Sequence, residues 1–331
     1  MPSRFLKAAL RDSTPYTPGE QPPDGGDWIK LNTNESPLPP SPKVIEAIRE
    51  AASDSLRLYP DAMAWPARRA IAGRFEVAPD QVALGNGADE LIDMCFRAFV
   101  GAGDRVAYCT PTYPVLEPLC RIHDAVPAPH KADADWHWDD RFAYDPAPLK
   151  FIVNPNSPTG TWADPAEVER AVEVSRGVVV LDEAYVDFAP FDLLGLQRRY
   201  RNLLVLRTFS KSYALAGMRI GYAIGSPDLI ASLDAVKDSY NLDRIAIAAA
   251  VAAIEDEEHH RKIVDFVVAE RDWLADELAG QGFEVTPSKA NFVFVKPPRI
   301  SGAAVADALR EQQILVRRYD LEPIAGWLRI T

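Results

Sequence analysis

Four short segments of the sequence carry residue types that could do chemistry together. The first is the glycine-rich run Gly85–Glu90, which leads into an apolar-periodic stretch that ends near Phe99. A glycine-rich turn at a helix start exposes unpaired backbone N–H groups and the positive end of the helix dipole, so it can bind a phosphate. A tight turn with Asp89 as the helix cap explains the same residues equally well. A dinucleotide-binding fingerprint is excluded, because its sixth position holds Glu90.

The second segment places an acidic residue at the end of an apolar run. Val178–Leu181 is followed directly by Asp182, with Tyr185 three residues later. A carboxylate at the exit of a buried strand can keep a ring nitrogen protonated through a charge-assisted hydrogen bond. Taken alone, Asp182 could also be a metal ligand or a helix cap.

The third segment places a lysine just beyond another apolar run. Lys211 follows Leu203–Leu206 by five residues, and Ser210 and Arg219 flank it as candidate phosphate ligands. A desolvated lysine, or one near other cations, can lose its proton and attack a carbonyl. A solvated surface lysine is the alternative for any single Lys.

The fourth segment is the proline-containing turn Asn154–Gly160. Its two X-Pro steps fix a rigid turn, and Asn156 could donate a hydrogen bond to a ligand oxygen, although stiffness alone would explain the prolines. The four segments together offer a phosphate site, a carboxylate for a pyridinium, an amide donor and a nucleophilic lysine. This set suits pyridoxal 5′-phosphate.

Alternating strands and helices must position these segments. Unbroken apolar runs predict strands that are covered on both faces, as parallel strands are. The runs are Val106–Cys109, Phe151–Val153, Val178–Leu181, Leu203–Leu206 and Ile220–Ile224. Helical patterns lie among and before them, for example Glu167–Val174, Pro66–Phe75 and the stretch after Pro42. We therefore expect an α/β fold with a mostly parallel central sheet and helices on both faces, with ligands at the carboxyl ends of its strands.

The two ends of the chain differ from this middle part in composition and in their pattern of predicted helices and strands. The first 42 residues are rich in proline and glycine and predict an extended arm. From about Asp228 long helical stretches appear, followed by two alternating segments, a further helix and a strand around Ile314–Val316. We expect an arm over residues 1–42, a large cofactor-binding domain over 43–235 and a small α+β domain over 236–331.

Composition and charge limit the classes of binding partner and the cellular location that we expect. The 331 residues carry a formal net charge of −12, which disfavours nucleic acid and anionic membrane surfaces. The apolar stretch Ile245–Ile254 is too short to span a membrane, and residues 1–10 lack a secretory signal, so we expect a cytoplasmic protein. Three cysteines without paired spacing predict buried free thiols and no metal site: Cys95, Cys109 and Cys120.

Several of these motifs resemble those of a known family. Asn154–Gly160 and Thr208–Gly221 are similar to the core motifs of the fold-type I pyridoxal-phosphate aminotransferases. Pro15–Gly19, Leu31–Pro37 and Arg57–Asp61 resemble the histidinol-phosphate aminotransferase branch. The resemblance covers nearly the whole chain. It implies amino-group transfer between histidinol phosphate and 2-oxoglutarate, which gives imidazole acetol phosphate and glutamate.

The resemblance also implies roles for residues around the cofactor ring. Lys211 would bind the aldehyde as a Schiff base and then shuttle the substrate proton. Asp182 would keep the pyridine nitrogen protonated. Tyr185 and Asn156 would bond the phenolic oxygen, and Tyr113 would stack on the ring.

The resemblance also implies which residues bind the phosphate of the cofactor. It assigns the cofactor phosphate to the backbone N–H groups of Ala88 and Asp89 and to the side chains of Ser210 and Arg219. Tyr59 would reach that phosphate in a neighbouring subunit, which implies a homodimer.

The substrate half of the site is implied in the same way. Arg329 matches the arginine that clamps the substrate carboxylate. Arg317 matches a position associated with the substrate phosphate, although Arg318 stands next to it. Asn34 falls in a matching substrate-binding motif.

Other functions are compatible with parts of this pattern. A phosphothreonine decarboxylase or an aromatic aminotransferase would share the scaffold. A transcription regulator with an aminotransferase-like domain would need a DNA-binding module, for which the arm is too short and the charge is wrong. A nicotinamide-dependent dehydrogenase would need the third glycine of its fingerprint.

Overall fold

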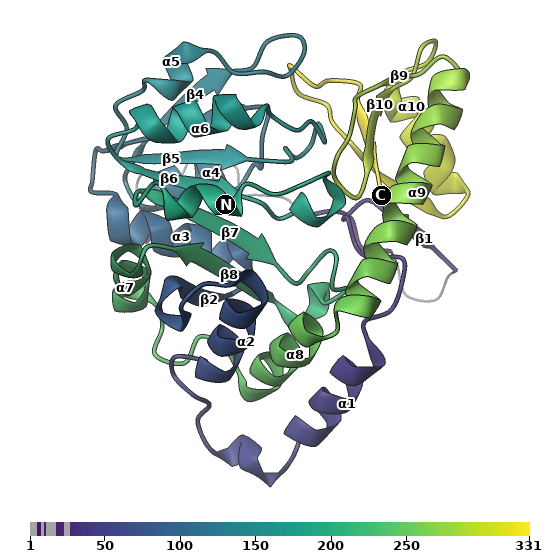
Figure 1. Cartoon of the computed structure of the whole chain (residues 1–331). Helices are drawn as coiled ribbons and strands as arrows, with labels where there is room; N and C mark the ends of the chain where they lie inside the picture. Colours follow the sequence, from purple (N-terminus) through teal and green to yellow (C-terminus); the bar gives the residue numbers. More distant parts are fainter. Residues whose placement is uncertain (1–4, 8–9, 11–17, 23–26) are drawn as a thin grey trace.

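A seven-stranded sheet forms the centre of the computed structural model, which describes residues 5–7, 10, 18–22 and 27–331 (Figure 1). The strand order is β2-β8-β7-β6-β5-β3-β4. The neighbours from β7 to β4 are all parallel, whereas β8 runs antiparallel to β7 and to β2. The strands are β2 (Val82–Asn86), β3 (Arg105–Thr110), β4 (Val126–Lys131), β5 (Leu149–Val153), β6 (Val178–Asp182), β7 (Leu203–Thr208) and β8 (Ile220–Gly225).

Helices cover both faces of this sheet, and each face has its own apolar core. Side chains alternate along the strands, so Val179 and Leu181 of β6 enter one core while Val180 enters the other. One core holds side chains of α1 (Pro42–Ala51), α2 (Trp65–Phe75), α5 (Asp140–Ala143), α6 (Pro165–Val174) and α8 (Arg244–Glu255). The other holds α3 (Ala88–Phe99), α4 (Leu116–Ile122) and α7 (Pro227–Val236). The predicted α/β fold with a mostly parallel central sheet is confirmed.

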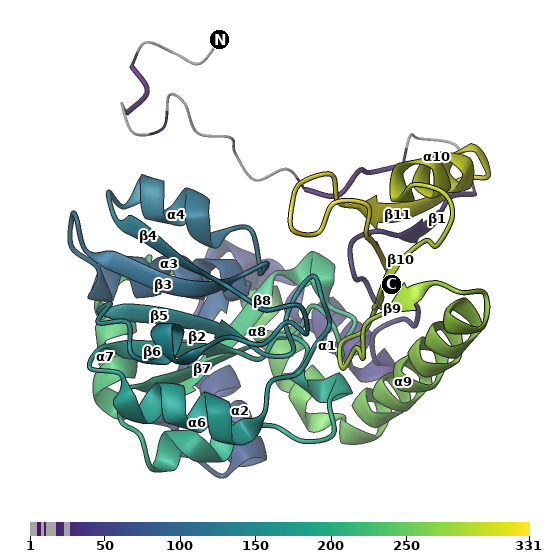
Figure 2. The same cartoon turned by 90° about the horizontal axis from the view of Figure 1, so that it is seen from above.

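A second, five-stranded sheet lies beside the first (Figure 2). Its order is β1-β11-β12-β10-β9, in which only β1 and β11 pair in parallel. The strands are β1 (Ile29–Leu31), β9 (Glu284–Val285), β10 (Val293–Lys296), β11 (Ile314–Arg318) and β12 (Leu328–Ile330). The helices beside it are α9 (Glu257–Gly280) and α10 (Gly302–Glu311). Helix α9 begins near α8 and continues to the small sheet (Figure 1).

Two packing relations cross the expected domain boundaries. Strand β1 comes from the expected arm, yet Ile29 pairs with Ile314 at the edge of the small sheet. Helix α8 falls in the expected small domain, yet it packs against α1 and α2 in a core of the large sheet. The boundaries after residues 42 and 235 stay predictions.

Four strands were not expected from the sequence, and one of them is β2, whose five residues end in the glycine-rich Gly85–Asn86 segment. Strand β1 has three residues in a proline-rich arm, and β4 carries Pro127 and Pro129, which mask a strand pattern but are tolerated at a sheet edge. Strand β12 has three residues near the end of the chain. Short strands give too little periodicity to be found.

Candidate functional site

A cleft of about 1130 Å³ opens at the carboxyl ends of the large sheet, and residues of the small sheet also line it. Most of the residues singled out in the sequence line it, although they come from distant parts of the chain. They are Asn34, Ala88, Asp89, Tyr113, Asp182, Tyr185, Ser210, Lys211, Arg219, Arg317 and Arg329. The volume is sufficient for a cofactor together with a small substrate.

Lys211 stands in the turn that follows β7. Its side chain is half-buried, and its Nζ lies 5.7 Å from the centroid of the Tyr185 ring. The turn is closed by a bond from the Ala214 N–H to the Lys211 carbonyl and another from the Leu215 N–H to the Phe209 carbonyl. The lysine is therefore presented to the cleft by an ordered turn.

Asp182 ends β6 at the floor of the cleft. Burial raises the pKa of its carboxyl to about 7. The Ala184 N–H, which donates to Oδ1 at 3.0 Å, and the Lys211 ammonium lower this pKa, while Asp89 and Glu183 raise it. A buried carboxylate that accepts one hydrogen bond from the described residues is costly to ionise, so it gains from a cationic N–H placed against it.

Tyr185 is hydrogen-bonded by Asn34, a residue of the N-terminal arm. Its hydroxyl accepts a hydrogen bond from Asn34 Nδ2 at 2.8 Å, and its ring packs edge-on against Phe292. Because the hydroxyl is the acceptor in this bond, its own proton remains for another acceptor. Asn34 has φ of 55°, a conformation that asparagine tolerates, and its carbonyl accepts from Asn291 Nδ2 at 3.1 Å.

The amino end of α3 forms a cradle for an anion. Gly87 caps the helix with φ of 80° and no side chain caps its first amides, which have no acceptor within the helix. The backbone of β8 approaches closely here, because a Cβ on Gly221 would lie 2.5 Å from the Ala88 nitrogen. Ser210 and Arg219 line the same part of the cleft.

The Asp89 carboxylate accepts hydrogen bonds from two side-chain donors beside this cradle. Its carboxylate accepts from the Tyr113 hydroxyl at 2.8 Å and from Arg219 Nη2 at 3.1 Å. The side chain of Asp89 thus stands where a bound oxyanion would find partners. It is not the helix cap, since that position belongs to Gly87.

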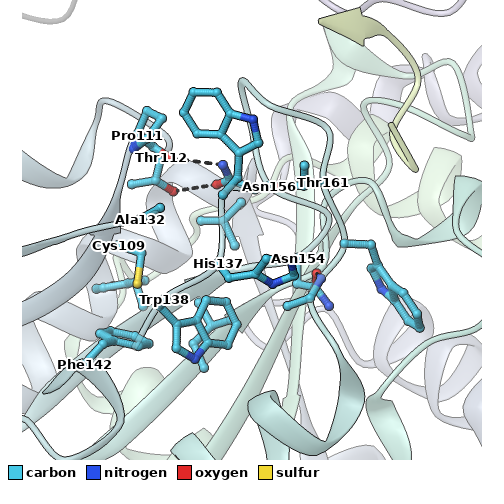
Figure 3. Close-up of a pocket in the computed structure, with 16 residues that line it drawn as sticks. Cys109, Pro111, Thr112, Ala132, His137, Trp138, Phe142, Asn154, Asn156 and Thr161 are labelled. Carbon is cyan, nitrogen blue, oxygen red and sulfur yellow. Dashed lines mark hydrogen bonds between the residues drawn. The ribbon is translucent and has the colours of Figure 1, made fainter. Parts of the chain in front are cut away.

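Asn156 lies outside the cleft in this structure. It lines a separate cavity of about 30 Å³ under the Asn154–Gly160 turn (Figure 3). Its Nδ2 donates to the Pro111 carbonyl at 3.0 Å and to Thr159 Oγ1 at 2.8 Å, while Oδ1 accepts from Thr112. One amide hydrogen joins the turn to the Pro111 loop and the other is used inside the turn, so neither is directed at a cleft ligand.

Ser157, the next residue, faces the cleft instead. Its Oγ accepts from Arg329 Nη1 at 3.2 Å. Sequence reasoning missed Ser157 because successive residues of an irregular turn have no fixed side-chain alternation. Asn291 and Thr331, which both bond Asn34, were missed because neither carries a local motif.

Arg329 lies on β12 between the arm and the turn. Besides the Ser157 contact, its Nη2 donates to the Asn32 carbonyl at 3.1 Å, and the guanidinium lies over Phe292. Its Nε is buried without a hydrogen-bond partner among the described residues. A buried, unsatisfied guanidinium nitrogen is a position for an incoming oxyanion.

Two predicted residues lie at the margin of the site or beyond it. Arg317 lines the cleft, and its Nη1 donates to the Pro18 carbonyl at 3.2 Å. Tyr59 does not line the cleft of its own chain; it is 77% exposed and stacks on Tyr240 with a centroid separation of 4.4 Å. Of the Pro15–Gly19 motif, residues 15–17 lie outside the described residues.

Other expectations concern thiols, metals and membranes. Cys95 and Cys120 are buried and Cys109 is half-buried; all three are free. The described part of the chain contains no cluster of three or more potential metal-binding side chains. It also contains no helix that combines the length and the apolar character needed to cross a membrane.

Comparison with known proteins defines the class. The family model for class I and class II aminotransferases matches residues 26–331. The chain belongs to this family, which confirms the resemblance inferred from its motifs.

Individual relatives narrow the family further. A histidinol-phosphate aminotransferase of Geotalea daltonii is 40% identical over 98% of this chain and 94% of the relative. A second, histidinol-phosphate aminotransferase 2 of Gluconobacter oxydans, is 46% identical over 99% of this chain and 94% of the relative. The crystal structure of histidinol-phosphate aminotransferase from Sinorhizobium meliloti with pyridoxal 5′-phosphate is 28% identical. It superposes with a TM-score of 0.85 over 92% of this chain and 86% of that one.

Proposed function

We propose that this chain is a pyridoxal-phosphate-dependent aminotransferase that exchanges an amino group between histidinol phosphate and 2-oxoglutarate. The observation that carries the proposal is the meeting of Lys211, Asp182 and the uncapped end of α3 in one cleft with Arg329. The relatives named for this reaction support the choice of substrate.

The residues of the cleft fit the cofactor. The amides at the start of α3, with Ser210 and Arg219, suit its phosphate, and Asp89 would release Tyr113 and Arg219 to make room. When bound, pyridoxal phosphate supplies an electron sink for negative charge at the substrate carbon that carries the amino group.

The protein's own groups then hold and move protons. The buried Asp182 holds a proton at the ring nitrogen, because a cationic N–H offsets the desolvation of its carboxylate. The Tyr185 hydroxyl, oriented by Asn34, donates to the phenolic oxygen. The Lys211 amine takes a proton from the substrate carbon and returns it at the neighbouring cofactor carbon.

Arg329 and Arg317 bind the oxyanions of the two substrates. The fork of Arg329, with its unsatisfied Nε, suits the carboxylate of glutamate or 2-oxoglutarate. Histidinol phosphate has no carboxylate, and its phosphate stands one carbon from the amino-bearing carbon. Arg329 therefore meets an oxyanion in both half-reactions, and Arg317 adds a second cation for the phosphate.

The active unit is proposed to be a homodimer that acts in the cytoplasm. Apolar side chains are exposed around Tyr59, with Leu56 and Leu58 about half exposed, which is typical of a covered surface. Sedimentation should give twice the chain mass, and Tyr59→Phe should weaken cofactor retention without dissociating the dimer. A monomer with full activity would contradict this part.

A single-turnover experiment tests the reaction. The cofactor-loaded enzyme is mixed with L-histidinol phosphate without 2-oxoglutarate, and imidazole acetol phosphate is quantified by mass spectrometry. We expect one equivalent per active site, followed by glutamate formation when 2-oxoglutarate is added. Release of carbon dioxide from phosphothreonine, or product only from aromatic amino acids, would assign one of the other reactions of this scaffold.

A further inference from the structure

The two loops that carry Lys211 and Tyr185 are joined by the residues next to them. Ser212 Oγ donates a hydrogen bond to Asp187 Oδ2. Asp187 belongs to the short helical turn η4 (Val186–Phe188), which follows Tyr185 directly. The bond therefore connects the turn after β7 with the turn after β6, one or two residues from each functional side chain.

A residue of α9 meets the same carboxylate oxygen. His260 Nε2 lies 3.2 Å from Asp187 Oδ2. The imidazole also stacks on the Tyr213 ring, with centroids 4.2 Å apart. Because Asp187 is an acceptor, Nε2 carries the hydrogen in this pair. Ser212, His260 and Asp187 form a cluster that we call the Asp187 junction.

One face of α9 continues this contact along η4. Ile263 and Val267 pack with Tyr185 and Phe188 in a small apolar cluster. Arg271 Nη1 donates to the Phe188 carbonyl at 3.0 Å and to the Ala290 carbonyl at 3.1 Å. The spacing from His260 to Arg271 places these side chains on one helix face.

The far end of α9 supports the small sheet. Leu274, Ala275 and Leu278 pack against the core that contains Val293 and Val295 of β10. The helix is continuous over 24 residues between the two contacts (Figure 1). One helix therefore contacts both η4 and the small sheet.

The charge of Asp187 is favoured by its surroundings. Burial raises the pKa of its carboxyl, but the hydrogen bond and charge of His260, the charge of Arg207 and the Ser212 hydroxyl lower it, to about 2. The group is an acceptor-only carboxylate over the neutral range. An amide in its place would keep one acceptor oxygen and lose the charge that holds two donors.

We propose that Asp187 is a positioning residue that fixes the Lys211 turn against the Tyr185 turn and ties both to helix α9. This inference rests on the proposed function for its catalytic consequence, but the junction itself concerns only contacts within the chain. The junction sets where the lysine amine and the tyrosine hydroxyl stand relative to each other.

Three substitutions test the junction: Asp187→Asn, Ser212→Ala and His260→Gln. Asp145→Asn is a matched control, because Asp145 also accepts from a histidine, His130, at 2.9 Å but lies away from the cleft. In the cofactor-loaded proteins we measure the pH midpoint of the visible absorbance of bound pyridoxal phosphate, and kcat and KM. The junction variants should shift the midpoint and lower kcat about 10-fold to 100-fold, with KM changed less. The control should leave both unchanged.

Hydrogen exchange of the cofactor-free protein gives a readout that needs no activity. Ser212→Ala, the mildest change, should speed exchange in both turns, residues 183–188 and 209–215, while the control should not. An unshifted absorbance midpoint with wild-type kcat in Asp187→Asn, or unchanged exchange in Ser212→Ala, would overturn the proposal. Failure of the wild-type enzyme to use histidinol phosphate would instead count against the proposed substrate and leave the exchange result to judge the junction.

Discussion

The two walls of the cleft are built differently. The wall formed by the large sheet presents Asp182, Ser210 and the start of α3 from strand ends that are buried in two apolar cores. The opposite wall, formed by the small sheet and the loop after β11, combines the packed guanidinium of Arg329 with exposed groups; Leu321 is 80% exposed and Arg318 pairs with two surface carboxylates. We therefore expect the bond chemistry at residues of the large sheet and substrate recognition at residues between the two sheets.

This contrast predicts that substitutions in the first wall affect every substrate, whereas in the second wall a group that meets the oxyanion of both substrates, such as Arg329, affects both, and a group that meets only one, such as Arg317, distinguishes between them. The largest effect belongs to the lysine. Lys211→Ala should retain the fold, since its side chain is half-buried and lines the cleft, and should lower the turnover rate with any amino donor by about 10⁴-fold or more. Circular dichroism and a steady-state assay measure this pair of results. Turnover near the wild-type rate would remove Lys211 from the mechanism.

Asp182→Asn should have the next largest effect. An amide cannot hold the ring nitrogen protonated, so the rate should fall by about 10²-fold to 10⁴-fold. A kinetic assay at saturating substrate checks this. An unchanged rate would mean that another group serves the ring nitrogen.

The same substitution should stabilise the protein without its cofactor. Because burial raises the folded-state pKa of Asp182 to about 7, the folded state keeps a proton that the unfolded chain loses above about pH 4, so the wild type loses stability as the pH rises from about 4 to 7 and levels off above pH 7. We expect Asp182→Asn to be more stable than the wild type at pH 8, by about 4 kcal/mol for a shift of about three pKa units, with the difference vanishing near pH 4. Thermal unfolding over this pH range tests the sign. A variant less stable at pH 8 than at pH 4, relative to wild type, would contradict it.

Arg329→Lys should weaken the use of both substrates. A lysine keeps the charge but loses the bidentate fork, so kcat/KM should fall about 10-fold to 100-fold with glutamate and with histidinol phosphate. Parallel assays with the two donors show whether the loss is shared. A loss confined to one donor would mean that the oxyanions bind at different places.

Arg317→Ala should separate the two substrates, with a smaller effect. Its loss should raise KM for histidinol phosphate about 10-fold, since a cation is removed from the phosphate, and change KM for glutamate about 2-fold or less. Arg318→Ala is the matched control, because Arg318 is engaged by Asp307 and Asp320. Equal changes in KM for Arg317→Ala and Arg318→Ala would show that the two arginines act on the phosphate only through the general positive charge of this surface, without a specific contact from Arg317.

The residues of the large-sheet wall were easier to predict from the sequence than those of the small-sheet wall. Asp182, Ser210 and Lys211 follow buried strands with strong apolar patterns, so their meeting at one sheet edge could be predicted from the sequence. Asn156 shows where this reasoning fails, because the direction of a side chain in an irregular turn depends on partners such as Pro111 and Thr159.

The small-sheet wall was less predictable for a related reason. Strand β1 pairs with β11 across more than 280 residues, and that pairing places Asn34 near Tyr185. No local periodicity encodes such a contact, since it depends on the tertiary register. The Asp187 junction likewise joins three segments, none of which carries a motif for it.

The proposed reaction requires that the Lys211 amine is covalently joined to pyridoxal phosphate in the cleft. The direct test is to load the protein with pyridoxal phosphate, reduce it with borohydride, digest it and map the modified peptide by mass spectrometry. We predict one pyridoxyl group per chain, located on Lys211 and absent from Lys211→Ala. A label on another lysine, or no label in protein saturated with the cofactor, would contradict the account.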